Sequence, residues 1–221
     1  MEDLKNFIDT LLDYIYKKRC YFCGKSYECV KMCSKCYEEL KFSDLKPNRI
    51  ILGCDVYVAG IYEKNLQKMI RGIKYHKQKS LAYYQAKFMW EYFQELLERN
   101  NINKDFQVVP VPLYKTRERQ RGYNHMQLVA KEFCELSGFE PNYELITRVK
   151  HTKAQYKLSR QERLKNLHNA FKVDKTKLIE DKGILIIDDI CTTGSTFEAM
   201  ITELKSNGIN DIVCFATSSP Y

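Results

Sequence analysis

Residues 184–196 read ILIIDDICTTGST, with four aliphatic residues followed by two aspartates and a turn rich in hydroxyl groups. Four aliphatic residues in succession predict a strand that is buried on both faces, as in a parallel sheet. Asp188 and Asp189 stand at the carboxyl end of this strand, which is where ligands of open α/β sheets bind. Apolar residues at helical spacing begin after the turn, so the pattern predicts a strand, a turn and a helix in succession.

The turn Thr192–Thr196 has the features of an anion-binding site. Gly194 permits a left-handed backbone and the close approach of a ligand. The amides of the turn and of the first helical residues present N–H groups and a positive dipole end to an anion. Further donors come from the hydroxyl groups of Thr192, Thr193, Ser195 and Thr196. We therefore expect a phosphate group to bind at this turn.

Asp188 and Asp189 would lie beside the sugar of a phosphate ligand held in this turn. Carboxylates accept hydrogen bonds from the 2′- and 3′-hydroxyls of ribose, and they are among the oxygen ligands that Mg²⁺ prefers. The turn lacks the Gly-Lys-Ser/Thr of a Walker loop and a Gly-x-Gly-x-x-Gly dinucleotide fingerprint. The pattern therefore favours a sugar phosphate. The alternative is a structural strand with two solvated acids and an ordinary capping turn.

The remaining patterns predict an α/β protein. Strands are expected at 55–62, 107–112, 143–148, 183–189 and 212–216, and helices at 4–15, 66–75, 81–99, 124–136 and 195–207. Residues 41–49, which include Pro47, are expected to form a linker. From residue 107 onward strands alternate with helices, which argues for a parallel sheet flanked by helices. The helix at 4–15 has one apolar stripe and is expected to dock on the body of the protein, with partner binding as the alternative.

Five of the nine cysteines fall within Cys20–Cys36. Two Cys-x-x-Cys pairs, Cys20 with Cys23 and Cys33 with Cys36, offer four thiolates, which suit a tetrahedral structural zinc site. Redox chemistry and an iron–sulfur cluster are the alternatives, and Cys29 is a competing ligand. We expect a small module over residues 1–46 that contains this zinc site, followed by an α/β domain over residues 47–221.

The net charge of +8 is concentrated in two segments. Residues 113–125 hold four cationic side chains against one acid, and residues 148–165 hold seven against one. Such focusing suits a polyphosphate or a nucleic-acid backbone, although solvated charged segments are the plainer interpretation. Arg117 and Arg121 follow a proline-bracketed turn at a strand end and are candidates for pyrophosphate contacts. The candidates for nucleic-acid contacts are Lys150, Lys153, Tyr156, Lys157, Arg160 and Arg163.

The sequence predicts a cytoplasmic protein that does not insert into a membrane. It contains no apolar run long enough for a transmembrane helix. Acidic residues interrupt the N-terminal apolar positions, so a signal peptide is not expected. Clustered cysteines are typical of metal or redox chemistry in a reducing compartment.

Residues 184–196 resemble the phosphoribosyl pyrophosphate motif of type I phosphoribosyltransferases. The wider chain resembles the ComF competence-protein family in three further motifs. These are Val109-Pro110-Val111-Pro112 with Arg117 and Arg121-Gly122-Tyr123-Asn124, then Thr152, Gln155, Leu158, Arg163, Asn166 and Ala170-Phe171, and the N-terminal four-cysteine cluster. His125 departs from this family's pattern, in which glutamine is expected.

The resemblance implies a type I phosphoribosyltransferase-like sheet with a zinc module at its N-terminus. It implies that Asp188 and Asp189 bind the ribose hydroxyls with Mg²⁺ and that Thr192–Thr196 binds the 5′-phosphate. It also implies a hood over residues 151–167, from which Lys153 or Arg160 would neutralise pyrophosphate.

For the cell, the resemblance implies a role in natural transformation, in the handling of incoming single-stranded DNA, with a competence helicase as a partner. Three activities remain open. The protein could transfer phosphoribose to an unknown acceptor, act as a nucleobase-salvage phosphoribosyltransferase, or serve as a non-catalytic ligand-sensing module that binds DNA.

Overall fold

The computed structural model describes residues 19–26, 31–100, 102, 104–150, 167 and 169–220. The chain divides into two compact units, Met1–Lys41 and Phe42–Tyr221. The helix expected at residues 4–15 lies outside the described residues. In the smaller unit, the short helix α2 (Ser34–Glu38) follows directly after Cys33 and carries Cys36.

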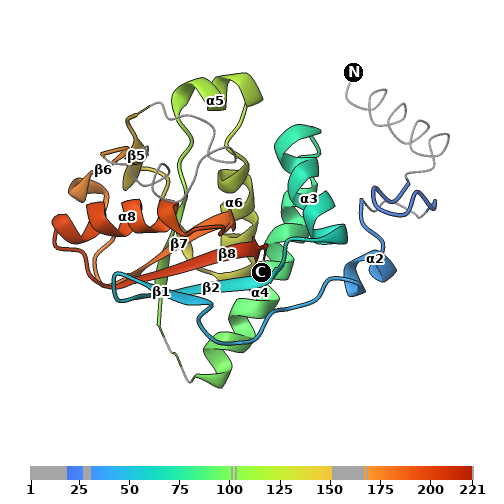
Figure 1. Cartoon of the computed structure of the whole chain (residues 1–221), viewed down its shortest axis with the longest axis horizontal. Coiled ribbons are helices and arrows are strands. Elements are labelled where there is room, and N and C mark those ends of the chain that lie inside the picture. Colours follow the sequence, from blue (N-terminus) through green and yellow to red (C-terminus); the bar gives the residue numbers. More distant parts are fainter. Residues whose placement is uncertain are drawn as a thin grey trace, which may run out of the picture. The chain divides into compact units, whose positions relative to one another are not determined.

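The larger unit is built on a six-stranded sheet with the order β1-β2-β8-β7-β3-β4 (Figure 1). The strands are β1 (Arg49–Ile51), β2 (Cys54–Ile61), β3 (Phe106–Pro110), β4 (Glu140–Pro141), β7 (Gly183–Ile190) and β8 (Ile212–Ser219). All neighbours pair in parallel except β1, which is antiparallel to β2. This mostly parallel sheet confirms the fold class expected from the alternation of strands and helices.

Helices connect the parallel strands. They are α3 (Lys64–Tyr75), α4 (Leu81–Arg99), α5 (Lys115–Arg121), α6 (His125–Ser137) and α8 (Ser195–Ser206), with a short 3-10 helix at η2 (Lys175–Lys177). Among the described residues, no helix combines the length and the apolarity that crossing a bilayer requires.

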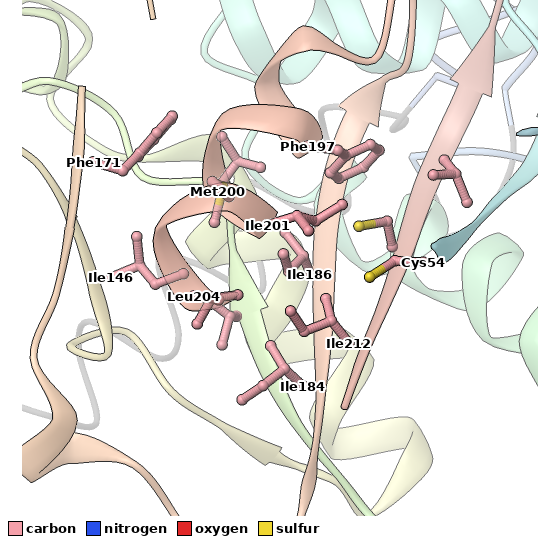
Figure 2. Packing of buried hydrophobic residues seen from close by; sticks show 14 of the residues in the cluster. Cys54, Ile146, Phe171, Ile184, Ile186, Phe197, Met200, Ile201, Leu204 and Ile212 are labelled. Atoms are coloured by element: carbon pink, nitrogen blue, oxygen red, sulfur yellow. The ribbon is translucent and has the colours of Figure 1, made fainter. Parts of the chain in front are cut away.

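The central strand β7 is buried on both faces, as its aliphatic run predicts. Ile184 and Ile186 belong to a core cluster with the apolar side of α8, where Phe197 and Leu204 pack over them (Figure 2). Leu185 alternates with these isoleucines and is also fully buried. Both faces of β7 are therefore covered by packed side chains, which leaves its carboxyl end as the place where a ligand could reach this strand.

Aromatic rings fill the core on the side of α4 and α6. Phe93 on α4 lies 5.2 Å from the ring of Phe215 on β8 and 6.2 Å from that of Phe133 on α6. Phe106 and Phe139 complete this group of mutually contacting rings. Such rings bury large apolar areas, so this layer fixes α4 and α6 against the sheet.

The strand expected at 143–148 is present over a shorter range, but it does not join the parallel sheet. It forms β5 (Ile146–Arg148), which pairs antiparallel with β6 (Phe171–Val173) in a separate two-stranded sheet. Each of these strands buries only alternate residues, because one face packs into the α8 core while the other faces solvent. A buried parallel strand would have needed apolar residues on both faces.

Three further differences concern short segments. The linker expected at 41–49 ends in strand β1, which begins at Arg49. The charged residues 115–121, for which no element was expected, form the helix α5. Strands β1, β4 and β6 have three, two and three residues, so their periodicity is too short to detect in the sequence.

Candidate functional site

The carboxyl end of β7 carries the two adjacent aspartates. Asp189 is buried, with 4% of its surface exposed, whereas Asp188 is half-buried. Their backbone is held by the neighbouring strand, because Ser218 Oγ on β8 donates to the carbonyl of Asp189 at 3.0 Å. The amide of Asp189 donates to Asp188 Oδ1 at 2.8 Å. The pair is thus a fixed feature of the sheet, as the sequence predicts.

Two cationic or polar side chains from other elements contact the buried carboxylate. Asp189 Oδ2 lies 2.5 Å from Lys74 Nζ on α3 and 2.5 Å from His125 Nε2 on α6. Burial opposes ionisation of Asp189, but Lys74 and His125 hold its pKa well below the usual range. Asp189 is therefore a charged group whose charge is compensated within the protein.

His125 also contacts the arginine that ends α5. Its Nδ1 lies 2.7 Å from Arg121 Nη1. Burial lowers the pKa of His125, and the attraction of Asp189 only partly offsets this, so the neutral imidazole is favoured. The ring is fixed in place by the start of α6, where the side chain of Asn124 accepts from the amide of Met126 at 3.0 Å and caps the helix.

Asp188 is in a different electrostatic state from its neighbour. Burial and the adjacent carboxylate of Asp189 raise the pKa of Asp188 to about 8. Lys74 acts in the opposite direction on the same carboxyl. The strand end therefore presents one compensated carboxylate and one acid that gains from a new cation or hydrogen-bond donor.

The turn after β7 has the conformation that the sequence predicts. Gly194 is left-handed, with φ of 79°, and α8 begins at the next residue. Thr193 Oγ1 lies 3.0 Å from Ser195 Oγ, and Arg49 Nη1 on β1 donates to the carbonyl of Thr192 at 3.0 Å. The first amides of α8 have no acceptor within the helix, as at every helix start. The turn thus has the donors that a phosphate requires.

Arg148 was counted only as part of a basic segment, yet it lies at this site. It ends β5, is 9% exposed, and places its guanidinium 5.5 Å from the ring centre of Phe171. Burial and the nearby charge of Arg117 lower the pKa of Arg148 to about 10, while Asp188 acts in the opposite direction. Because Arg117 and Asp188 both act on Arg148, β5 and α5 lie near the carboxyl end of β7.

Only some of the expected site residues lie in the part of the chain that the structure describes. Arg121 reaches the acid pair through His125, and Arg117 acts on Arg148. Lys150 is exposed and lies two residues beyond the end of β5. The remaining basic candidates and the stacking tyrosine lie outside the described residues, namely Lys153, Tyr156, Lys157, Arg160 and Arg163.

Sequence reasoning missed Lys74, Arg148 and Arg49 as parts of this site. Each occurs far from residues 184–196 in the chain and follows no local motif. His125 was noted only as a departure from a family pattern. That departure was the one signal that could have directed attention to the contact with Asp189.

The smaller unit brings the four expected cysteines together. The sulfur atoms of Cys20, Cys23, Cys33 and Cys36 all lie within 4.8 Å of one another, and those of Cys23 and Cys33 are 3.9 Å apart. The amide of Cys33 donates to Cys20 Sγ at 3.5 Å. Burial opposes ionisation of Cys20, but backbone N–H groups of Cys23, Cys33 and Phe22 lower its pKa to about 6. Cys29 lies outside the described residues.

Residues 121–218 match the family model of the phosphoribosyl transferase domain. This match, the mostly parallel sheet and the acid pair at the end of β7 define the larger unit as a phosphoribosyltransferase-type domain. Adenine phosphoribosyltransferase from Thermoanaerobacter pseudethanolicus is a structural neighbour with a TM-score of 0.33 and 15% identity, covering 65% of this chain and 83% of that one.

Three curated relatives are informative. Competence protein F of Haemophilus influenzae is 25% identical over 198 residues, covering 87% of this chain and 86% of that protein. DNA utilization protein YhgH of Salmonella typhimurium is 27% identical over 147 residues, covering 66% of this chain and 64% of the relative. Competence protein ComFC of Bacillus subtilis is 35% identical over 94 residues, covering 42% and 36%. These similarities and the phosphoribosyl transferase match support the ComF family for this chain.

The packing of Gly194 can be tested by substitution. An added Cβ would lie 2.5 Å from Ile51 Cδ1 and would also force alanine into a left-handed backbone. Gly208 is a matched control, because its φ is +83° and a Cβ there meets nothing within 4 Å. By urea denaturation, Gly208→Ala should cost about 1 kcal/mol and Gly194→Ala about 1 kcal/mol more. Adding Ile51→Val should remove this excess, and equal losses in the two alanine variants would contradict the packing.

Removal of Lys74 should destabilise the domain, because it leaves the buried carboxylate of Asp189 with only a neutral partner. We expect Lys74→Met to reduce the free energy of unfolding by about 3 kcal/mol. The control is Lys131→Met, which breaks an exposed pair with Glu135 and should cost at most about 1 kcal/mol. Equal losses for the two variants, measured by urea denaturation, would mean that the Lys74 pair does not stabilise the fold.

Proposed function

We propose that the phosphoribosyltransferase-type domain binds phosphoribosyl pyrophosphate, or a similar phosphorylated ribose, together with Mg²⁺. The 5′-phosphate binds the turn Thr192–Thr196, the ribose hydroxyls face Asp188 and Asp189, and the pyrophosphate faces Arg117, Arg121 and Lys153. The observation that carries the proposal is the continuity of the acid pair with the left-handed turn at Gly194 and the start of α8. Within one short segment, the carboxylates can accept hydrogen bonds from the ribose hydroxyls, and the amides and hydroxyls of the turn can donate hydrogen bonds to a phosphate.

The two aspartates have different tasks in this proposal. Asp189 is held by Lys74 and His125, so its carboxylate is largely occupied within the protein. Asp188 is half-buried and has a raised pKa, so its charged form is stabilised by ribose hydroxyls or by a divalent cation. Asp188 therefore makes the closer contact with the ligand, and Asp189 sets the geometry of the strand end.

The oxygen atoms of Asp188 and Asp189 are the candidates to hold Mg²⁺. Their chemistry fits, because Mg²⁺ takes carboxylate and phosphate oxygens and retains several water molecules. When bound with the ligand, the ion would neutralise phosphate charge. The arginines contribute independently of the metal, since Arg117 and Arg148 already repel each other and a polyanion relieves that repulsion.

The relatives support a role in competence and DNA uptake, because they are named competence proteins and DNA utilization proteins. Single-stranded DNA would then contact the basic residues Lys150, Lys153, Tyr156, Lys157, Arg160 and Arg163. A competence helicase is a candidate partner for the same role. Whether the domain transfers phosphoribose or only holds it is decided by incubating the full chain with ligand, Mg²⁺ and candidate acceptors and measuring pyrophosphate release.

The proposed ligand contact of Asp188 has a direct test. Asp188→Asn should weaken the calorimetric affinity for phosphoribosyl pyrophosphate with Mg²⁺ by about tenfold or more, since hydrogen bonds to a charged group are lost. The melting temperature should not fall, because the substitution removes a charge that burial disfavours.

Asp211→Asn provides the control for that experiment. Asp211 is an exposed acid that immediately precedes β8, at the opposite end of the sheet from the acid pair, and pairs with Lys104. Its substitution should leave the affinity unchanged. Wild-type affinity in a folded Asp188→Asn variant would refute the proposed site.

We also propose that Cys20, Cys23, Cys33 and Cys36 hold a structural zinc ion. Zn–S bonds of about 2.3 Å in a tetrahedron place the sulfur atoms roughly 3.8 Å apart, which the Cys23–Cys33 separation of 3.9 Å matches. All four ligands come from the protein, so the site has a structural role.

Elemental analysis tests the zinc proposal. Protein purified without chelator should contain about one zinc per chain, as expected for four thiolate ligands on one ion. Cys36→Ser should lose most of this zinc, whereas Cys134→Ala, which removes a buried thiol of α6, should retain it. Zinc contents that do not differ between the two variants would exclude the cluster as the binding site.

A further inference from the structure

The imidazole of His125 bridges two charged groups from different parts of the domain. Its Nδ1 lies 2.7 Å from Arg121 Nη1 at the end of α5, and its Nε2 lies 2.5 Å from Asp189 Oδ2 at the end of β7. The His125 side chain is 6% exposed, so water contributes little to these contacts. The two halves of the proposed site, the pyrophosphate side and the ribose side, are thus joined through one ring.

The chemistry of the two partners fixes the direction of both hydrogen bonds. A guanidinium has only donors, so Nδ1 of His125 must accept from Arg121. An ionised carboxylate has only acceptors, so Nε2–H must donate to Asp189. The neutral tautomer with its proton on Nε2 is the form that satisfies both partners. The other tautomer would place two donors against each other at Nδ1 and two acceptors at Nε2.

The bridge is supported at both of its ends. Lys74 Nζ contacts the same Asp189 oxygen at 2.5 Å, and the guanidinium of Arg121 lies 5.8 Å from the ring centre of Tyr75. Lys74 and Tyr75 are the last turn of α3. The charged groups that act on His125 are therefore Asp189, Lys74 and Arg121, and they form one continuous set across α3, β7, α6 and α5.

We propose that His125 is a positioning residue that aligns Arg121 with Asp189. The pyrophosphate-facing arginine and the ribose-facing end of β7 then hold a fixed relative position before the ligand binds. This inference rests on the proposed function. Pre-aligned groups lose less conformational freedom on binding, which increases affinity. The gain applies to a ligand that carries pyrophosphate. Ribose 5-phosphate lacks that group and gains little from an aligned Arg121.

Glutamine can reproduce the bridge, and leucine cannot. The side-chain oxygen of glutamine accepts from Arg121 while its NH₂ group donates to Asp189, in the same directions as the imidazole. Leucine fills a similar space without either bond. His125→Gln and His125→Leu therefore separate the directional bridge from simple packing.

The test compares two ligands by calorimetry with the full chain and Mg²⁺. His125→Leu should weaken phosphoribosyl pyrophosphate binding by about tenfold but ribose 5-phosphate binding by less than about threefold, since one aligned arginine is lost for only one ligand. His125→Gln should restore the affinity for phosphoribosyl pyrophosphate. Equal losses for both ligands in His125→Leu, or a His125→Gln variant as weak as His125→Leu, would overturn the inference.

A second measurement needs neither ligand nor a folded leucine variant. Long-range ¹H–¹⁵N spectra of the ligand-free protein report the tautomer of each histidine, and the His125 signal is the one absent from His125→Gln. A neutral imidazole protonated at Nε2 is expected, and a Nδ1–H tautomer or an imidazolium at pH 7.5 would overturn the bridge. If the wild-type protein binds neither ligand, the proposed function fails, and these spectra alone decide whether the bridge exists.

Discussion

The buried carboxylate of Asp189 links helices α3 and α6 to the end of the central strand β7 through ion-pair and hydrogen-bond contacts. Removing a charge from water costs several kcal/mol unless the charge is paired and hydrogen-bonded. Lys74 and His125 provide this pairing at 2.5 Å each, and they come from α3 and α6. The convergence of β7, α3 and α6 is therefore required by electrostatics as well as by the apolar core. The same atoms that stabilise the strand end also shape the candidate site.

The compensation of Asp189 has a chemical consequence for its neighbour. Because Lys74 and His125 satisfy Asp189, the half-buried Asp188 carries the raised pKa of the pair. Three arginines act at this strand end: Arg148 and Arg117 through their charges, and Arg121 through its contact with His125. The first amides of α8 are further hydrogen-bond donors. Most of these groups favour an anionic ligand, while Asp188 favours hydroxyls or a divalent cation. A phosphorylated sugar with a bound metal ion satisfies both preferences at once.

The sequence predicts those parts of the fold and site that depend on local patterns. The aliphatic run of β7, the adjacent acids and the turn at Gly194 occur in one short segment, and the two Cys-x-x-Cys pairs are equally local. The contacts of Asp189 are not local, because Lys74 on α3 and His125 on α6 lie far from it in the chain. The partner of β5 was likewise missed, since β6 has three residues and lies more than twenty residues further along the chain. Periodicity reports which residues are buried, but it does not report which distant side chain meets a buried charge.

The central claim concerns what the end of β7 holds, and a crystal structure of the full chain with phosphoribosyl pyrophosphate and Mg²⁺ tests it most directly. Density for the 5′-phosphate is expected on the amides of Thr193–Thr196, with the ribose hydroxyls within hydrogen-bond distance of Asp188 and the pyrophosphate toward Arg121. Ligand density at another surface, with the turn and Asp188 left without contacts to it, would contradict the account.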